Sequence, residues 1–507
     1  MSLPSHSRSL RLGLWLGVLV LLLSSCAGAD RPRSEPTAAD RTVWKPASLV
    51  VAAVTGAPGE DGPSRPPSLP AAPLTIDQAV AFAIAHNPDL DMAAARIRQA
   101  DAQIDQAEAA FWPALGLYTS STQGDAPSAF FFSRLDQRDF SFTTDFNDPG
   151  PFRNFESGAT LRWNLFNGGR DLLGHELART ARELRELEAA GVRNALAHAV
   201  IRACTSFYTA RDHRLIADQA VATVAAQLED TRIRHRGGSA LKSEVLSLEA
   251  RLAEVQAERI QADSQQQAAL ATLANLLGQD ADTPVRLAAA SWQAPQLPPD
   301  YPSGLLAALA TRPELAGARR QVHASRLAAA REQAGYLPNL DLEGRLYADS
   351  ENFQYSSNRD NWTAALMLRW DLFTGLGTRA RTRQAQAALT EMQAADRKAV
   401  QAVQLDVKQA YLSLAEVQAR LQAAQGGRLQ AEEALRLVQL EYQGGSAPIV
   451  RYLEAELMQH RARLTETRAR YDLSQARANV ARALGYFAGP PQAAAGAGEP
   501  PRSDHAG

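Results

Sequence analysis

The sequence LRWNLFNGGR at residues 161–170 recurs as LRWDLFTGLG at residues 368–377, which lies 207 residues further along the chain. Later segments keep this offset: RGGS (236–239) with QGGS (443–446), and NLLG (275–278) with RALG (482–485). Earlier segments are 225 residues apart: NPDL (87–90) with RPEL (312–315), and FWP (111–113) with YLP (336–338). Matching landmarks in the same order over most of the chain indicate an internal duplication.

Four segments near these landmarks alternate between apolar and polar residues: Ala114–Ser121, Ser157–Phe166, Leu340–Tyr347 and Thr363–Phe373. In an extended strand, Leu368 and Trp370 lie on one face and Arg369 lies on the other. Such alternation in segments of about ten residues is typical of transmembrane β-barrels. An antiparallel sheet with one face on a soluble core is the alternative. The full charges on the polar face, and the lack of another domain to pack against, favour the barrel.

The number of strands has a consequence for assembly. Four strands are too few to close a barrel, and an open sheet edge is not tolerated in a bilayer. Three copies would supply twelve strands, which is within the range of known barrels. The strand count therefore predicts a homo-oligomer.

A very long helical pattern follows each tryptophan segment, at about Arg170–His235 and Thr378–Gln443. As a helix, each stretch would span about 100 Å. Each ends at a pair of glycines, and a return helix of roughly forty residues is expected to follow. Apolar residues recur at threes and fours, as at Val245, Leu248 and Leu252, which predicts a narrow coiled-coil seam. Helices of this kind contact neighbours sideways and are suited to the wall of a tube.

The two ends of the chain differ in composition from the rest. Residues 1–25 have a basic start and an apolar run too short to span a bilayer, and Cys26 follows small residues as in a bacterial lipoprotein signal peptide. An ordinary signal peptide with an incidental cysteine is the alternative. Residues 26–73 are expected to be a flexible Pro- and Ala-rich tether, and residues 488–507 a disordered tail. The two repeats are then residues 74–290 and 291–487.

Composition argues against several kinds of function. The chain has 53 basic and 55 acidic residues and a net charge of −2. It therefore has no net positive charge that would attract nucleic acid. Its histidines have no metal-ligand spacing, and no phosphate-binding loop is present. We therefore expect no enzyme, no cofactor and no metal site. Cys204 lies in a helical pattern and is expected to be a core residue without a disulfide partner.

The duplicated openings, tryptophan junctions, GGS turns and closing LLG and ALG segments resemble the TolC family of outer membrane efflux proteins, over residues 74–487. The lipoprotein-like start is similar to the OprM-like lipoprotein subgroup. The resemblance implies an α+β membrane protein: a trimeric twelve-stranded β-barrel in the outer membrane, continued by a coiled-coil helical tunnel in the periplasm. The implied partners are two identical chains, a periplasmic adaptor (membrane fusion) protein, an inner membrane pump of the RND or ABC type, and outer membrane lipid.

The resemblance also places functional residues at the far ends of the long helices. Two tips are expected to contact the adaptor: Gly237, Gly238 and Ser239, and Gly444, Gly445 and Ser446. Glycine permits the positive-φ turn that reverses a helix hairpin. The alternative is that these residues only form the turn. Forming the turn and contacting the adaptor are compatible roles.

The family closes its tunnel with acidic and polar residues six and nine positions after the tip glycine. Here these positions hold Glu244, Ser247, Arg451 and Glu454. In a trimer, Glu454 would form a ring that attracts cations. Arg451 departs from the acidic pattern and is expected to pair with Glu244, Glu454 or a neighbouring helix. A solvated helix face is the alternative for this set.

These features favour an outer membrane channel, the passive exit duct of a tripartite efflux pump or a type I secretion system. Drugs, metal ions, solvents and proteins all remain open as cargo. The alternative is a periplasmic coiled-coil adaptor or scaffold without a pore. Adaptors also have helical hairpins, but two pairs of amphipathic strands distinguish the channel from them.

Overall fold

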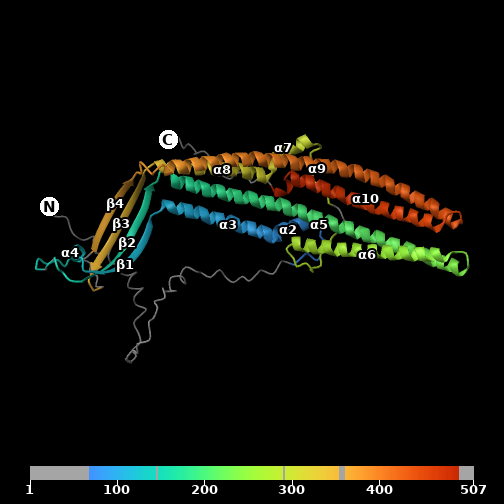
Figure 1. Ribbon diagram of the computed structural model, residues 1–507, viewed down its shortest axis with the longest axis horizontal. Helices are drawn as coiled ribbons and strands as arrows, with labels where there is room; N and C mark the ends of the chain where they lie inside the picture. The colour runs from blue at the N-terminus through green and yellow to red at the C-terminus, as the bar shows by residue number, and fades with distance from the viewer. Residues whose placement is uncertain (1–67, 144, 146, 289–291, 353–359, 490–507) are drawn as a thin grey trace, which may run out of the picture. The chain divides into compact units, whose positions relative to one another are not determined.

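The computed structural model describes residues 68–143, 145, 147–288, 292–352 and 360–489 of the 507-residue chain. The expected signal peptide, Cys26, and most of the expected tether and tail lie outside these residues. The described residues, from Ser68 onward, combine long helices with one four-stranded sheet, and the sheet lies at one end of the helices (Figure 1). The expected α+β architecture is therefore confirmed.

The two repeats have the same order of elements, except that the first has an additional helix, α4, between its two strands. The first contains α2 (Ile76–His86), α3 (Pro88–Glu108), β1 (Ala114–Gly124), α4 (Pro127–Asp136), β2 (Phe152–Phe166), α5 (Arg170–Arg236) and α6 (Lys242–Leu276). The second contains α7 (Tyr301–Thr311), α8 (Pro313–Gln333), β3 (Asn339–Ser350), β4 (Asp360–Arg369), α9 (Gly377–Gln443) and α10 (Ile449–Ala483). Short 3-10 turns are η2 (Ala109–Phe111), η3 (Ala334–Tyr336) and η4 (Tyr486–Ala488). We call α5 with α6 the first hairpin and α9 with α10 the second.

The long helices match the expected lengths closely. Helices α5 and α9 have 67 residues each, and the return helices α6 and α10 have 35 each, slightly fewer than expected. The short helices α2 and α3 begin at residues whose side chains cap them. Thr75 and Gln78 form a reciprocal capping box at the start of α2, and Asn87 caps α3 with Pro88 in its first turn.

The sheet is antiparallel with the order β1-β2-β3-β4. One face, which we call the polar face, carries Tyr118, Glu156 and Arg345, and the Arg345 guanidinium hydrogen-bonds to both of the other side chains. The opposite apolar face is exposed: Leu117 is 81% exposed and Leu368 66%. The outer edges of β1 and β4 have no neighbouring strand in the described part of the chain.

The prediction that the fourth strand runs to Phe373 was wrong, because β4 ends at Arg369. Arg369 pairs with Asn339, which is the first residue of β3. The preceding residue, Pro338, has no N–H to donate, so the ladder stops there. The chain then turns through two positive-φ residues, Gly375 and Leu376, into α9.

Trp370, which lies beyond the strand, ties the sheet to the helices. Its indole N–H donates to the carbonyl of Tyr336 at 3.0 Å. Trp163 makes the same bond, also at 3.0 Å, to the carbonyl of Phe111. Each tryptophan therefore joins a strand–helix junction to the end of the preceding short helix, and the duplication in the sequence is repeated in the tertiary contacts.

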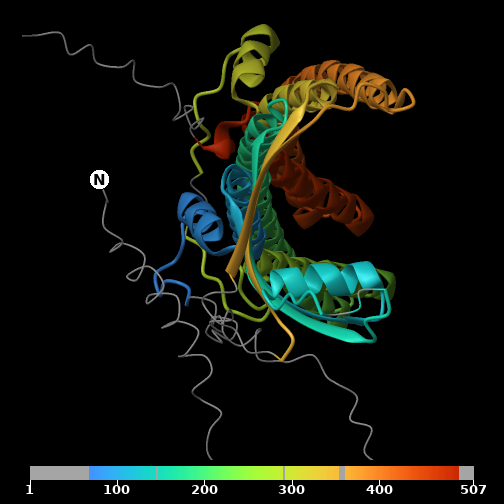
Figure 2. The ribbon, with the colours of Figure 1, turned by 90° about the vertical axis from the view of Figure 1, so that its left-hand side faces the viewer.

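The aromatic stretch at residues 130–132 belongs to the helix α4. Pro127 occupies its first turn, where the missing N–H costs nothing. Helix α4 follows β1 and lies at the end of the sheet away from the long helices (Figure 1), the end that faces the viewer in Figure 2.

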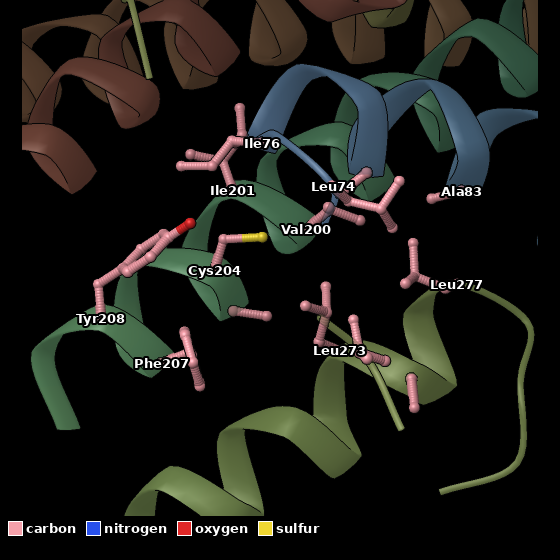
Figure 3. Close-up of a cluster of buried hydrophobic side chains, with 14 of the residues drawn as sticks. Leu74, Ile76, Ala83, Val200, Ile201, Cys204, Phe207, Tyr208, Leu273 and Leu277 are labelled. Atoms are coloured by element: carbon pink, nitrogen blue, oxygen red, sulfur yellow. The ribbon is translucent and has the colours of Figure 1, made fainter. Parts of the chain in front are cut away.

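The main core lies where α2, α5 and α6 meet (Figure 3). Leu74, Ile201 and Leu273 come from three segments distant in sequence and are all nearly inaccessible to solvent. Cys204 is fully buried among them, and burial raises the pKa of its thiol to about 12. The expectation that Cys204 is a core residue is confirmed.

Among the residues described, no helix is both long enough and apolar enough to cross a membrane.

Candidate functional site at the helical tips

Both hairpins turn through the same backbone motif at the expected glycines. At the first tip, Gly238 has φ +76°, its N–H donates to the carbonyl of His235, and the N–H of Ser239 donates to that of Arg234. At the second tip, Gly445 has φ +78°, with bonds from Gly445 to Tyr442 and from Ser446 to Glu441. These are Schellman motifs, which satisfy helix-end carbonyls and need a residue in the left-handed region.

The tip serines have a capping role of their own. The hydroxyl of Ser239 donates to the Arg234 carbonyl at 3.1 Å, and that of Ser446 to the Glu441 carbonyl at 2.9 Å. Both serines and the four tip glycines are exposed. A Cβ added at Gly238 or Gly445 would meet no atom within 4 Å. The tips are thus small, rigid and open to a partner.

The four expected aperture residues lie in the first turns after the tips. Glu244 and Ser247 are half-buried on α6, whereas Arg451 and Glu454 are exposed on α10. Of the pairings expected for Arg451, the structure shows the one with a neighbouring helix: its Nη1 lies 3.4 Å from Oε2 of Glu441 on α9. Glu454 is therefore not neutralised by that arginine.

Arg451 and Glu454 border one groove between α9 and α10. The groove has a volume of about 420 Å³, and its lining is mostly apolar, with Ala431, Ala434, Val438, Ala455 and Met458 beside Gln430. The two charges stand at the edge of this apolar surface.

Aromatic and apolar contacts hold the two hairpins together just behind the tips. The rings of Tyr442 and Tyr452 stack with centroids 5.5 Å apart, and the Arg234 guanidinium lies over the Tyr442 ring at 5.9 Å. Apolar residues of α5 and α6, including Leu228 and Leu248, complete this cluster. Burial raises the pKa of Tyr452.

A buried ion pair between α6 and α10 was missed by sequence reasoning. Arg251 and Glu456 are 6% and 4% exposed, and Nε of Arg251 lies 3.0 Å from Oε2 of Glu456. Burial alone would lower the pKa of Arg251, but hydrogen bonds to Glu254 and Glu456 raise it. Nearby, Nε2 of the buried His460 lies 2.7 Å from Oε2 of Glu258 on α6. In the sequence these charges cannot be told from those of a solvated helix face.

Within the described residues, no three His, Cys, Asp or Glu side chains gather in a way that could hold a metal ion. The site consists instead of two turns, a few charges and a groove at the ends of long hairpins, with an amphipathic sheet at their other end. This combination defines the subunit of an outer membrane channel.

Comparisons with known proteins agree with this class. The outer membrane efflux protein family matches residues 80–279 and 305–486, and the chain belongs to this family. Protein CyaE of Bordetella pertussis is 28% identical over 426 residues, which are 83% of this chain and 82% of that protein. The pyoverdine export outer membrane protein OpmQ of Pseudomonas aeruginosa is 24% identical over 414 residues, 81% of this chain and 85% of that protein.

The fold also matches the solved structure of the outer-membrane channel OprN, with a TM-score of 0.70 and 22% sequence identity. The match covers 81% of this chain and 89% of that one. The chain is accordingly an exit duct for efflux or type I secretion. The alternative of an adaptor without a pore does not fit this family or its sheet.

Proposed function

We propose that three copies of this chain form a lipid-anchored export duct, which receives cargo from an inner membrane pump through a periplasmic adaptor. The observation that carries the proposal is the sheet, whose apolar face is exposed and whose β1 and β4 edges have no partner strand in the described chain. In a bilayer, open edges leave backbone groups unsatisfied at a cost of several kcal/mol each. Pairing of β4 with β1 of the next copy removes every edge.

Purified protein in detergent tests the assembly. We expect a trimer that inserts into planar bilayers and conducts ions. A stable monomer that stays soluble without detergent would contradict the proposal. The anchor at Cys26 is tested separately by the intact mass of the mature protein, which should begin at Cys26 and carry attached acyl chains. A mature chain without lipid would remove the anchor and leave the channel in place.

The exposed glycine tips support adaptor docking. Replacing Ser239 and Ser446 together by tryptophan is expected to abolish export in cells while the trimer remains, because bulk would keep the adaptor from the turns. Replacing both by alanine removes the same hydroxyl bonds without adding bulk, at a cost of about 1 kcal/mol each. The alanine variant should therefore still export. If both variants export equally well, the serines stabilise the turn only and do not contact the adaptor.

The exposed carboxylate of Glu454 supports an aperture ring. In single-channel recordings, Glu454→Ala is expected to lower cation selectivity and weaken block by multivalent cations, since three negative charges leave the constriction. Arg451→Ala should shift selectivity the opposite way, because it removes three positive charges from the same groove. Unchanged conductance and block in both variants would assign these residues to a solvated helix face.

A further inference from the structure

Helix α4 packs on the polar face of the sheet. The ring of Phe130 meets that of Phe152 edge-on, with centroids 6.3 Å apart, and both are 6% exposed. Gln137, which follows α4 and is 2% exposed, donates from Nε2 to Oδ1 of Asn154 at 2.8 Å. Along β2, Phe152 and Asn154 share a face with Glu156, which belongs to the polar face. In a closed barrel, this is the inner face.

The segment is also tied across the sheet. Arg134 pairs with Glu351, just beyond β3, at 2.8 Å. The carbonyl of Asp136 accepts from Nδ2 of Asn361 at 3.2 Å, and Arg138 donates to the carbonyl of Asp360 at 3.2 Å. The α4 segment therefore reaches from β2 to β4 at the outer end of the sheet.

The exposed surface of α4 and of the residues that follow it is apolar. Phe132 is 62% exposed, Leu135 41% and Phe142 93%. Edge-on ring contacts from Phe131 to Phe140 (5.7 Å) and from Phe140 to Phe142 (5.0 Å) hold this surface together. Leaving a large apolar side chain in water forgoes about 1.5–3 kcal/mol of burial free energy. Several such side chains in one patch indicate an interaction surface.

We propose that this surface meets its counterparts on the two other copies and forms an apolar constriction at the external mouth of the barrel. The inference rests on the proposed homotrimer. Threefold symmetry places three inner-face segments around one opening, so the occupant of each patch is a second copy of this chain. A ring of phenylalanines narrows the opening, and its poor wetting slows polar solutes. The outlet then has a size filter of its own, far from the helical tips.

Thiol labelling from outside intact cells tests the constriction without interference from the periplasmic end. Thr160 lines a pocket of about 320 Å³ on the polar face, so Thr160→Cys reports entry of membrane-impermeant maleimides through the mouth. The native Cys204 is fully buried and gives little background. With both Phe132→Ser and Phe142→Ser added, large maleimides should label the reporter about tenfold faster, and the smallest should change little.

Two further variants distinguish an error in the constriction from an error in the proposed barrel. Arg134→Ala removes the tie to Glu351 and should also speed labelling by large reagents. Leu117→Cys, on the apolar face, should stay unlabelled because lipid covers it. If the trimer forms and Thr160→Cys reacts at the same rate in all backgrounds and at every reagent size, the constriction is wrong. If the smallest reagent never reaches Thr160→Cys, or labels Leu117→Cys as readily, the proposed barrel itself is wrong.

Discussion

Gly278→Ala is expected to destabilise the chain by about 2–4 kcal/mol. Gly278 follows α6 with φ +71°, and a Cβ there would lie 2.5 Å from the carbonyl oxygen of His86. That oxygen belongs to the backbone of the last residue of α2, which cannot rotate aside as a side chain would. Asn87 is held in the same place by a 2.9 Å bond from its amide to the carbonyl of Leu276. The substitution therefore strains the turn and pushes two packed segments apart.

The repeat supplies matched controls for this prediction. Gly485 is the equivalent residue, with φ +79°, but the nearest atom to its added Cβ is the carbonyl oxygen of Thr311 at 3.3 Å. Gly445 has a similar φ and nothing within 4 Å. Thermal midpoints of helical circular dichroism in detergent should fall most for Gly278→Ala, less for Gly485→Ala, and least for Gly445→Ala, where only about 1 kcal/mol of backbone strain applies. Equal losses at all three positions would show that φ alone decides.

Glu456→Ala is expected to destabilise the packing of the two hairpins by about 3–5 kcal/mol, because it leaves a buried charge without its partner. Arg251 is 6% exposed and keeps only its 2.6 Å contact with the exposed Glu254. Arginine cannot relieve the penalty by losing its proton.

The double variant Arg251→Met with Glu456→Leu is the control. It replaces both charges by apolar groups of similar size, and such replacements of buried pairs are often neutral or stabilising. The same thermal midpoints in detergent should return close to those of the unchanged chain. A double variant as unstable as Glu456→Ala would mean that packing at this position, and not the unpaired charge, determines the loss.

The local elements could be derived from the sequence because local chemistry specifies them. The hairpin turns at Gly238 and Gly445 and the alternation in the strands each depend on neighbours a few residues away. Because the chain is duplicated, each of these patterns is present in both repeats. The expected tips therefore coincide with the observed turns.

Contacts between distant segments were not readable in this way. The end of β4 depends on Pro338, which precedes β3, and α4 depends on the sheet beneath Phe130. Arg451 was expected to have one of three partners, and only the approach of α9 selects Glu441.

By itself, the sequence determined the repeat, the class of each long element and the positions where the chain reverses, because helix periodicity, strand alternation and positive-φ glycines act over short range. Only the tertiary structure decided that Arg251 and Glu456 are buried together and that α4 covers the polar face. The buried ion pair and the α4 contact both depend on which surfaces pack together and are removed from water. Burial of that kind is a property of helices and strands brought together from distant parts of the chain.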